Sequence, residues 1–87
     1  MTEATDGIEA AVKEYILAEF LPGTRPTELT ASTPLVTGGV LDSLATVQLV
    51  GFLENRFQIE IAPHEASIDN LDSLTLIADL IRGKQAR

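Results

Sequence analysis

Apolar residues recur at helical spacing in three stretches of the chain. In the first, residues 7–20, the apolar positions lie three or four residues apart. Asp6 and Glu9 have the spacing of a capping box, so the first helix is predicted to begin just after Asp6. Pro22 and Gly23 predict its end.

The second stretch, residues 43–57, is the most apolar and predicts the central helix. Asp42 precedes it and is a good N-cap, because its side-chain oxygens can accept from the free backbone N–H groups of the first turn. The apolar residues of this helix are spread around most of its circumference: Leu44, Val47, Leu49, Val50, Phe52, Leu53 and Phe57. Such a helix either packs on several sides or presents part of its surface to a partner.

The third stretch predicts a last helix, which Asp72 and Ser73 are expected to cap. Its apolar residues form one face: Leu74, Ile77, Ala78 and Ile81. Arg82 and Lys84 supply the cationic last turn that favours a helix C-terminus, and Gly83 is predicted to be the C′ glycine beyond its end.

The segments between the helices carry turn-forming residues. Residues 21–41 are broken by prolines and glycines, so we predict a long loop there. Four apolar residues are expected to anchor it to the core: Leu29, Leu35, Val36 and Val40. Residues 57–61 alternate like a strand but have no partner strand, which predicts an extended connector. Residues 63–70 predict one short helix, opened by Pro63.

Together these elements predict an all-α fold: a small four-helix bundle with three longer helices, one short helix and a long loop between the first two helices. The 87 residues are expected to form a single domain, with residues 1–5 and 84–87 as frayed tails. A domain of this size buries roughly 60% of its unfolded surface, which allows a modest core but no deep substrate cavity.

The composition narrows the function classes. The 13 acidic residues outnumber 6 basic ones, and this negative charge opposes binding to nucleic acid. The charge suits partners with basic docking surfaces; the alternative is that it serves only solubility. The chain has no cysteine, so it has no disulfide and no thiol nucleophile of its own. Its start, MTEATDG, is not a secretory signal, and no apolar run approaches the ~20 residues of a membrane span. We expect a cytoplasmic monomer without membrane insertion.

The tripeptide Asp-Ser-Leu occurs twice, at residues 42–44 and 72–74, and the two copies differ in context. The second fits a plain cap before a terminal helix, and alone the first would have the same interpretation. However, two glycines and a long loop precede Ser43, and the most apolar helix follows it. Glycines allow another protein or an attached group to approach closely, and the field at a helix N-terminus favours a phosphate.

The stretch GGVLDSLATVQLVGFLENRFQIEI, residues 38–61, resembles the modification-site helix of carrier proteins, namely acyl, peptidyl and D-alanyl carrier proteins. The Thr-Pro-Leu segment at residues 33–35 resembles the loop ahead of that site in the family. Residues 71–81 resemble its last helix. The resemblance therefore covers nearly the whole chain.

The resemblance implies a four-helix bundle without catalytic activity, in which Ser43 is esterified by 4′-phosphopantetheine. It implies a phosphopantetheinyl transferase that takes this arm from coenzyme A with Mg²⁺, and an arm thiol that holds an acyl or aminoacyl group as a thioester. The further partners would be a loading enzyme (an adenylating ligase or an acyltransferase) and downstream biosynthetic enzymes. Ala45 and Gln48 stand where acyl carriers of fatty acid synthesis usually have acidic residues. This departure favours a specialised polyketide, nonribosomal peptide or aminoacyl-transfer pathway.

Seven residues are candidates for partner docking in such a carrier: Asp42, Leu44, Val47, Glu54, Glu60, Glu65 and Asp69. For the acidic members the alternative is a solvated face. For Leu44 and Val47 the alternative is a place in the core.

Other chemistries find less support in the sequence. The only histidine, His64, has no identifiable nucleophile or orienting partner and is expected on a surface loop. A calcium loop begun at Asp69 lacks the required glycine and final glutamate, so no metal site is predicted. Two further functions remain open: a helical interaction module in which Ser43 only caps a helix, and a hydrolase with Ser43 as nucleophile, which lacks a base and a pocket.

Overall fold

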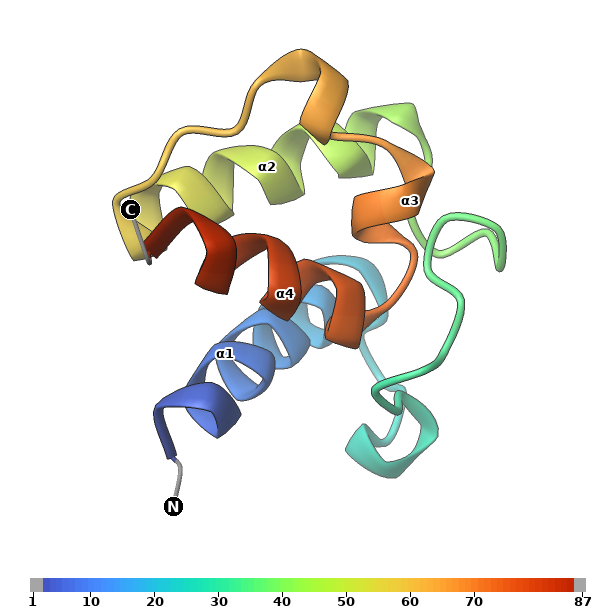
Figure 1. Ribbon diagram of the computed structural model, residues 1–87. Coiled ribbons are helices and arrows are strands. Elements are labelled where there is room, and N and C mark those ends of the chain that lie inside the picture. The colour runs from blue at the N-terminus through green and yellow to red at the C-terminus, as the bar shows by residue number, and fades with distance from the viewer. Residues whose placement is uncertain (1–2, 86–87) are drawn as a thin grey trace.

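The computed structural model describes residues 3–85, and this part of the chain is all-helical, as predicted (Figure 1). The α-helices are α1 (Glu3–Phe20), α2 (Ser43–Phe57), α3 (Ile68–Leu71) and α4 (Leu74–Gln85). Two short 3₁₀ turns complete the order, η1 (Pro26–Glu28) after α1 and η2 (Pro63–Glu65) after α2. No strand occurs among residues 3–85: Phe57 ends α2, Gln58 is a turn residue, and residues 59–61 form a connector without regular secondary structure. No helix in this part of the chain is long and apolar enough to cross a membrane.

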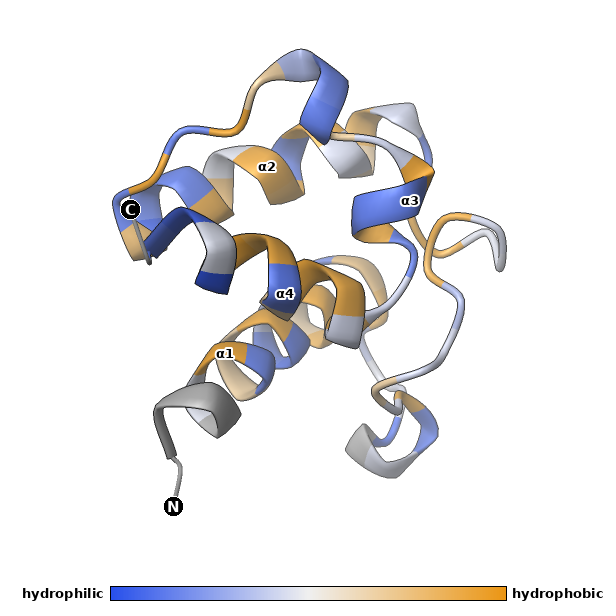
Figure 2. Cartoon of the chain, viewed as in Figure 1, coloured by the Kyte–Doolittle hydropathy of each residue, from blue (hydrophilic) through white to orange (hydrophobic). Residues whose placement is uncertain are grey.

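The helices enclose a shared apolar interior. α4 packs against α1 and α3, and α1 also contacts α2. Figure 1 shows the short α3 between the start of α2 and the start of α4, with the long α1–α2 loop along the same edge of the molecule. In Figure 2 the apolar residues of α1, α2 and α4 line the sides that face the interior.

The core is aliphatic, and every α-helix contributes to it. Its most completely buried side chains are Val12 and Ile16 of α1, Leu49 and Leu53 of α2, Leu71 of α3, and Ile77 and Ile81 of α4. The predicted apolar face of the last helix is confirmed, since all four of its residues are buried. The predicted loop anchors are also confirmed: Leu29 and Leu35 are fully buried, whereas Val36 and Val40 pack against the core from its edge.

The predicted start of the first helix is wrong. α1 begins at Glu3, so Asp6 lies within the helix and is not its cap. Glu3 and Ala4 are good helix formers, and acidic residues in a first turn are favoured by the helix dipole. Residues 3–5, expected in a tail, are therefore helical. The start of that tail, residues 1–2, lies outside the described residues.

Gly83 is not a C′ glycine, because α4 continues through it to Gln85. Lys84 pairs with Glu65 of η2, which gives the last turn a tertiary contact that the local sequence does not reveal. Residues 84–85 are thus helical, and residues 86–87 of the predicted tail lie outside the described residues. α2, in contrast, ends with a left-handed residue that is not glycine, Gln58, with φ 55°.

The single short helix predicted for residues 63–70 is two pieces, η2 and α3. Pro63 opens η2 at a first-turn position, as predicted. Ala66 then leaves helical geometry, with φ −86° and ψ 60°. The side-chain amide of Asn70 donates to the carbonyl of Glu65, which joins the two pieces across the break (2.9 Å).

Candidate functional site

Ser43 is the first residue of α2 and is exposed. The capping bond of this helix comes from its neighbour: Asp42 has extended backbone geometry, and its Oδ1 accepts from the backbone N–H of Ala45 at 2.7 Å. The Asp42 carbonyl also accepts the first helical bond, from Thr46 N–H at 2.9 Å. The predicted cap is therefore confirmed, and the helix start does not depend on the Ser43 hydroxyl.

In the second Asp-Ser-Leu copy the helix begins one residue later than in the first, and the serine caps it instead of the aspartate. α4 begins at Leu74, and Ser73 Oγ accepts from the backbone N–H of Leu76 at 3.2 Å, so the serine is the cap. The prediction that residues 72 and 73 both cap the last helix is thus right for Ser73 and wrong for Asp72. The same tripeptide leaves one serine exposed at residue 43 and uses the other within the fold.

The carboxylate of Asp72 binds the loop ahead of Ser43 instead of capping α4. Its Oδ1 accepts from the backbone N–H groups of Val36 (2.8 Å) and Thr37 (2.9 Å). Its Oδ2 accepts from the Thr37 hydroxyl at 3.0 Å. We call residues 35–41, which connect this contact to Asp42, the site loop.

The two glycines of the site loop are required by the loop itself. A Cβ on Gly38 would lie 2.3 Å from the carbonyl oxygen of Pro34, far inside van der Waals contact. Gly39 has φ +85°, a conformation that strains other residues, and its N–H donates to the Val36 carbonyl at 3.2 Å. Both glycines are exposed, so this part of the site loop presents backbone rather than side chains to the surface.

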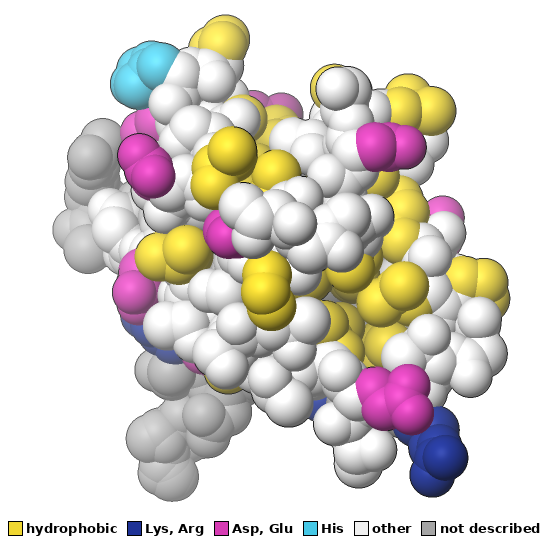
Figure 3. All heavy atoms as spheres, turned by 90° about the vertical axis from the view of Figure 1, so that its right-hand side faces the viewer, with side chains coloured by type: hydrophobic (Ala, Val, Ile, Leu, Met, Phe, Trp, Pro, Cys, Tyr) yellow, Lys and Arg dark blue, Asp and Glu magenta, His cyan; other side chains and the backbone are white. Residues whose placement is uncertain are grey.

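Large hydrophobic side chains are exposed close to Ser43 in sequence. Leu44 is 67% exposed and Val47 is 68% exposed, so the alternative that they belong to the core is wrong. Ile68 of α3 (52%) and Leu76 of α4 (37%) are the other large hydrophobic residues with high exposure in the described part of the chain. Figure 3, which views the edge where α2 begins, shows hydrophobic side chains at the surface in several places with mostly uncharged surface between them.

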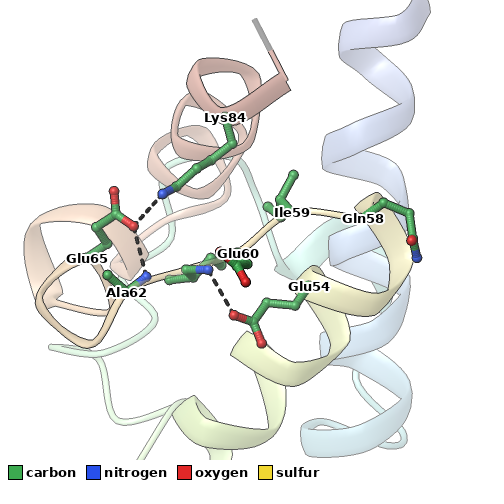
Figure 4. A pocket seen from close by; sticks show the side chains of 8 residues that line it. Glu54, Gln58, Ile59, Glu60, Ala62, Glu65 and Lys84 are labelled. Carbon is green, nitrogen blue, oxygen red and sulfur yellow. Dashed lines mark hydrogen bonds and ion pairs between the residues drawn. The ribbon is translucent and has the colours of Figure 1, made fainter. Parts of the chain in front are cut away.

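The four predicted acidic docking residues outside the motif fall into two groups. Glu60 and Asp69 are exposed. Glu54 and Glu65 instead make internal bonds: Glu54 Oε2 accepts from Ile61 N–H (2.8 Å), and Glu65 Oε1 accepts from Ala62 N–H (2.9 Å). Figure 4 shows both around a hollow of about 520 Å³ at the far end of α2 from Ser43. Their carboxylates hold the connector after α2, a structural role that was not predicted from the sequence, and their part in docking stays a prediction.

The carboxyl groups of Glu65 and Asp72 have pKa values below their ordinary range. For Glu65 the main cause is the hydrogen bond from Lys84, followed by the one from Ala62 N–H. For Asp72 it is the hydrogen bond from Thr37 N–H, reinforced by its hydroxyl and by Val36 N–H. In both cases the donors favour the ionised form, and partial desolvation opposes them.

These lowered pKa values predict that acid destabilises the fold. The unfolded chain binds the two protons at a higher pH than the folded chain, so their stabilisation is complete above about pH 5 and is lost as the pH falls below about 4. Thermal melts of Asp72→Asn and Glu65→Gln should therefore fall less steeply between pH 5 and pH 3 than those of the wild type. Glu60→Gln, at an exposed position of the connector after α2, is the matched control. Parallel acid profiles for all four proteins would contradict the prediction.

The other polar candidates do not converge. His64 is exposed in η2, as predicted. Among the side chains that the structure describes, no group of three or more His, Asp or Glu could hold a metal ion. Asn70 and Asp72 are used for the internal hydrogen bonds described above.

Sequence reasoning missed the role of Asp72, although the repeated tripeptide was a signal that its two copies needed comparison.

No family model matches the chain, and the search of curated proteins gives no match either. The case for a function therefore comes from the residues and their geometry.

Proposed function

We propose that this chain is a non-catalytic carrier protein in which Ser43 bears 4′-phosphopantetheine. The arm would tether an acyl or aminoacyl intermediate as a thioester and present it to partner enzymes. The observation that supports this most is that Ser43 is exposed at the start of a 15-residue helix whose cap is supplied by Asp42. A serine in that position can be esterified without loss of the helix start.

The residues at the start of α2 suit the group. A phosphodiester carries about one negative charge, which a helix N-terminus stabilises through its free N–H groups and its dipole. In the transfer, Ser43 Oγ forms a bond to the phosphorus that carries the pantetheine arm of coenzyme A. The phosphoanhydride bond breaks, adenosine 3′,5′-bisphosphate leaves with Mg²⁺ to balance its charge, and the hydroxyl proton passes to a base of the transferase. The bound group would supply the thiol that the chain lacks.

The surface around Ser43 can serve as the docking site for the transferase, for a loading enzyme (an adenylating ligase or an acyltransferase) and for downstream enzymes. Leu44 and Val47 offer apolar contact, and the exposed Asp69 of α3 offers charge. Glu60 is exposed as well, but it follows the other end of α2. Ala45 is buried and Gln48 is exposed. The absence of acidic side chains at both positions supports a specialised pathway rather than fatty acid synthesis.

The arrangement of the helices supports the same proposal. We infer that α1 to α4 form the four-helix bundle of carrier proteins, with α3 as the short helix and residues 21–42 as the long connection. The contacts of α4 with α1 and α3, and of α1 with α2, are compatible with such a bundle and support the proposal. We expect this carrier to be a cytoplasmic monomer.

A mass measurement tests the proposal directly. The purified chain is incubated with coenzyme A, Mg²⁺ and a promiscuous phosphopantetheinyl transferase, and its intact mass is recorded. We expect one phosphopantetheine per chain, and none when the transferase is left out. An unchanged mass with a transferase that modifies a known carrier in parallel would contradict the proposal.

The second candidate function is a helical interaction module without a prosthetic group. The two-thirds exposure of Leu44 and Val47 favours it, because exposed apolar side chains on one helix mark a contact surface. The same incubation separates the two functions, since the module gains no mass. A hydrolase would instead turn over an activated ester without any transferase.

A further inference from the structure

The site loop is held by a residue that follows it by more than thirty positions in sequence. Both N–H groups at the start of the loop, those of Val36 and Thr37, converge on Asp72 Oδ1 (2.8 and 2.9 Å), and the Thr37 hydroxyl reaches Oδ2 (3.0 Å). Successive backbone N–H groups that donate to one anion hold it strongly, because hydrogen bonds to a charged acceptor are stronger than those to a neutral one. The hydrogen bond from Thr37 N–H, with the others, lowers the pKa of Asp72, so its carboxyl group is ionised at neutral pH. We call this carboxylate, with its bonds to Val36 and Thr37, the clamp.

The clamp is connected to the start of α2 through Leu35. The backbone N–H of Leu35 donates to the Asp72 carbonyl at 2.7 Å, and the Leu35 carbonyl accepts from Leu41 N–H at 2.8 Å. The two ends of the site loop therefore meet at one fully buried residue. Leu41 is buried as well, and it is followed directly by Asp42 and Ser43. Hydrogen bonds thus lead from Asp72 through Leu35 to Leu41, and two covalent steps along the chain lead from there to Ser43.

The tip of the site loop has little else to hold it. Thr37, Gly38 and Gly39 are exposed, so their side chains bury almost no apolar surface. Glycine also gains more backbone freedom than other residues when a loop opens. A segment with few apolar contacts and exposed backbone hydrogen bonds lies at the low-stability end of a protein and opens first.

We propose that Asp72 is a positioning residue for Ser43, whose carboxylate holds the site loop closed and keeps the start of α2 in the geometry in which Ser43 is modified. The effect on modification depends on the proposed carrier function. The effect on the loop does not, so the two can fail separately. Asp72 touches neither Ser43 nor the arm, and it acts through residues 35–41.

Amide hydrogen exchange tests the clamp without any assumption about function. In Asp72→Ala we expect the amides of Val36, Thr37 and Leu41 to exchange about ten-fold faster or more, because their protection comes from the closed loop. In Asp72→Asn they should stay close to the wild type. The asparagine Oδ1 can keep both backbone bonds, and its Nδ2 can donate to the Thr37 hydroxyl oxygen. Unchanged protection in Asp72→Ala, or no rescue in Asp72→Asn, overturns the proposal.

The rate of modification tests the second half. With the transferase in fixed amount, Asp72→Ala should lower kcat/KM for the chain by about ten-fold if about a tenth of the molecules keep the competent loop. Asp72→Asn should restore the rate to within about two-fold. Ser73→Ala is the matched control, because it removes the neighbouring cap of α4 and leaves the Asp72 carboxylate in place.

The outcomes separate the two proposals. A fast loop exchange with a slow, rescued modification supports the positioning role. A fast loop exchange with a wild-type modification rate, or equal slowing in Ser73→Ala, overturns it. If the wild type itself gains no phosphopantetheine, the carrier function fails, and the exchange measurement alone decides whether Asp72 holds the loop.

Discussion

Ser43→Ala is expected to abolish the addition of phosphopantetheine completely and to leave the fold intact. The modification needs the hydroxyl oxygen, and no other residue replaces it, since Ser73 is half-buried and caps α4. The helix start should survive because the capping bond to Ala45 N–H comes from Asp42. Intact mass after incubation with coenzyme A and the transferase measures the first effect, and a thermal melt measures the second.

Ser73→Ala is the matched partner of this variant and should behave in the opposite way. It keeps the modification, and loss of its cap costs about 1 kcal/mol of the free energy of unfolding. Asp42→Ala should cost about the same, whereas Ser43→Ala should stay within about 0.5 kcal/mol of the wild type. Modification at Ser73, or a larger loss of stability in Ser43→Ala than in Asp42→Ala, would show that the two serines have been assigned the wrong roles.

The local signals of the sequence were sufficient where they agreed with the tertiary structure. Residues 43–57 were predicted as the central helix, and α2 has the same bounds. Asp42 was predicted as the N-cap of this helix, and it caps the helix in the structure. The buried face of α4 followed from its apolar spacing in the same way. The anchors of the long loop, Leu29 and Leu35, could be predicted because large aliphatic residues in a polar loop have few other places to go.

What the sequence did not reveal depends on contacts between distant residues. Asp72 and Thr37 are 35 positions apart, and nothing in either local pattern indicates that they bond. Glu54 was predicted as an exposed acidic residue of the central helix. In the structure its carboxylate accepts a hydrogen bond from Ile61 N–H, because the connector folds back beside α2. Gly83 has the local context of a helix end, but α4 continues to Gln85, and the Lys84–Glu65 pair holds this turn against η2.

The candidate site likewise has some features that the local sequence predicts and others that only the tertiary packing determines. The position of Ser43 at the start of α2 and the Asp42 cap could be predicted because both lie within one turn of helix. The exposure of Leu44 and Val47 could only be left open. An apolar residue at helical spacing is compatible with either a core or a contact surface, and only the packing of the other helices decides between them. Here those helices cover Leu49 and Leu53 and leave Leu44 and Val47 uncovered.

Leu49→Ala and Val47→Ala, on opposite sides of α2, should therefore separate stability from docking. Leu49 is fully buried, so its truncation leaves a cavity and should lower the free energy of unfolding by about 2–5 kcal/mol. Val47 is 68% exposed, and its truncation should change that free energy by about 0.5 kcal/mol or less. Urea denaturation of both variants measures the difference.

The kinetics of modification complete the comparison. If Val47 contacts partners, Val47→Ala should lower kcat/KM of the transferase for the chain about five-fold or more, as loss of more than about 1 kcal/mol at an interface does. Ala18, exposed on α1, offers a control in Ala18→Ser, which should leave kcat/KM unchanged and cost only about 0.5 kcal/mol of the free energy of unfolding through its lower helix propensity. Core and contact residues act on different steps: loss of Leu49 lowers the fraction of folded chains, whereas loss of Val47 lowers the affinity of chains that remain folded. A Val47→Ala protein that is destabilised as much as Leu49→Ala, yet modified at the wild-type rate once folded, would place Val47 in the core and remove the apolar part of the docking surface.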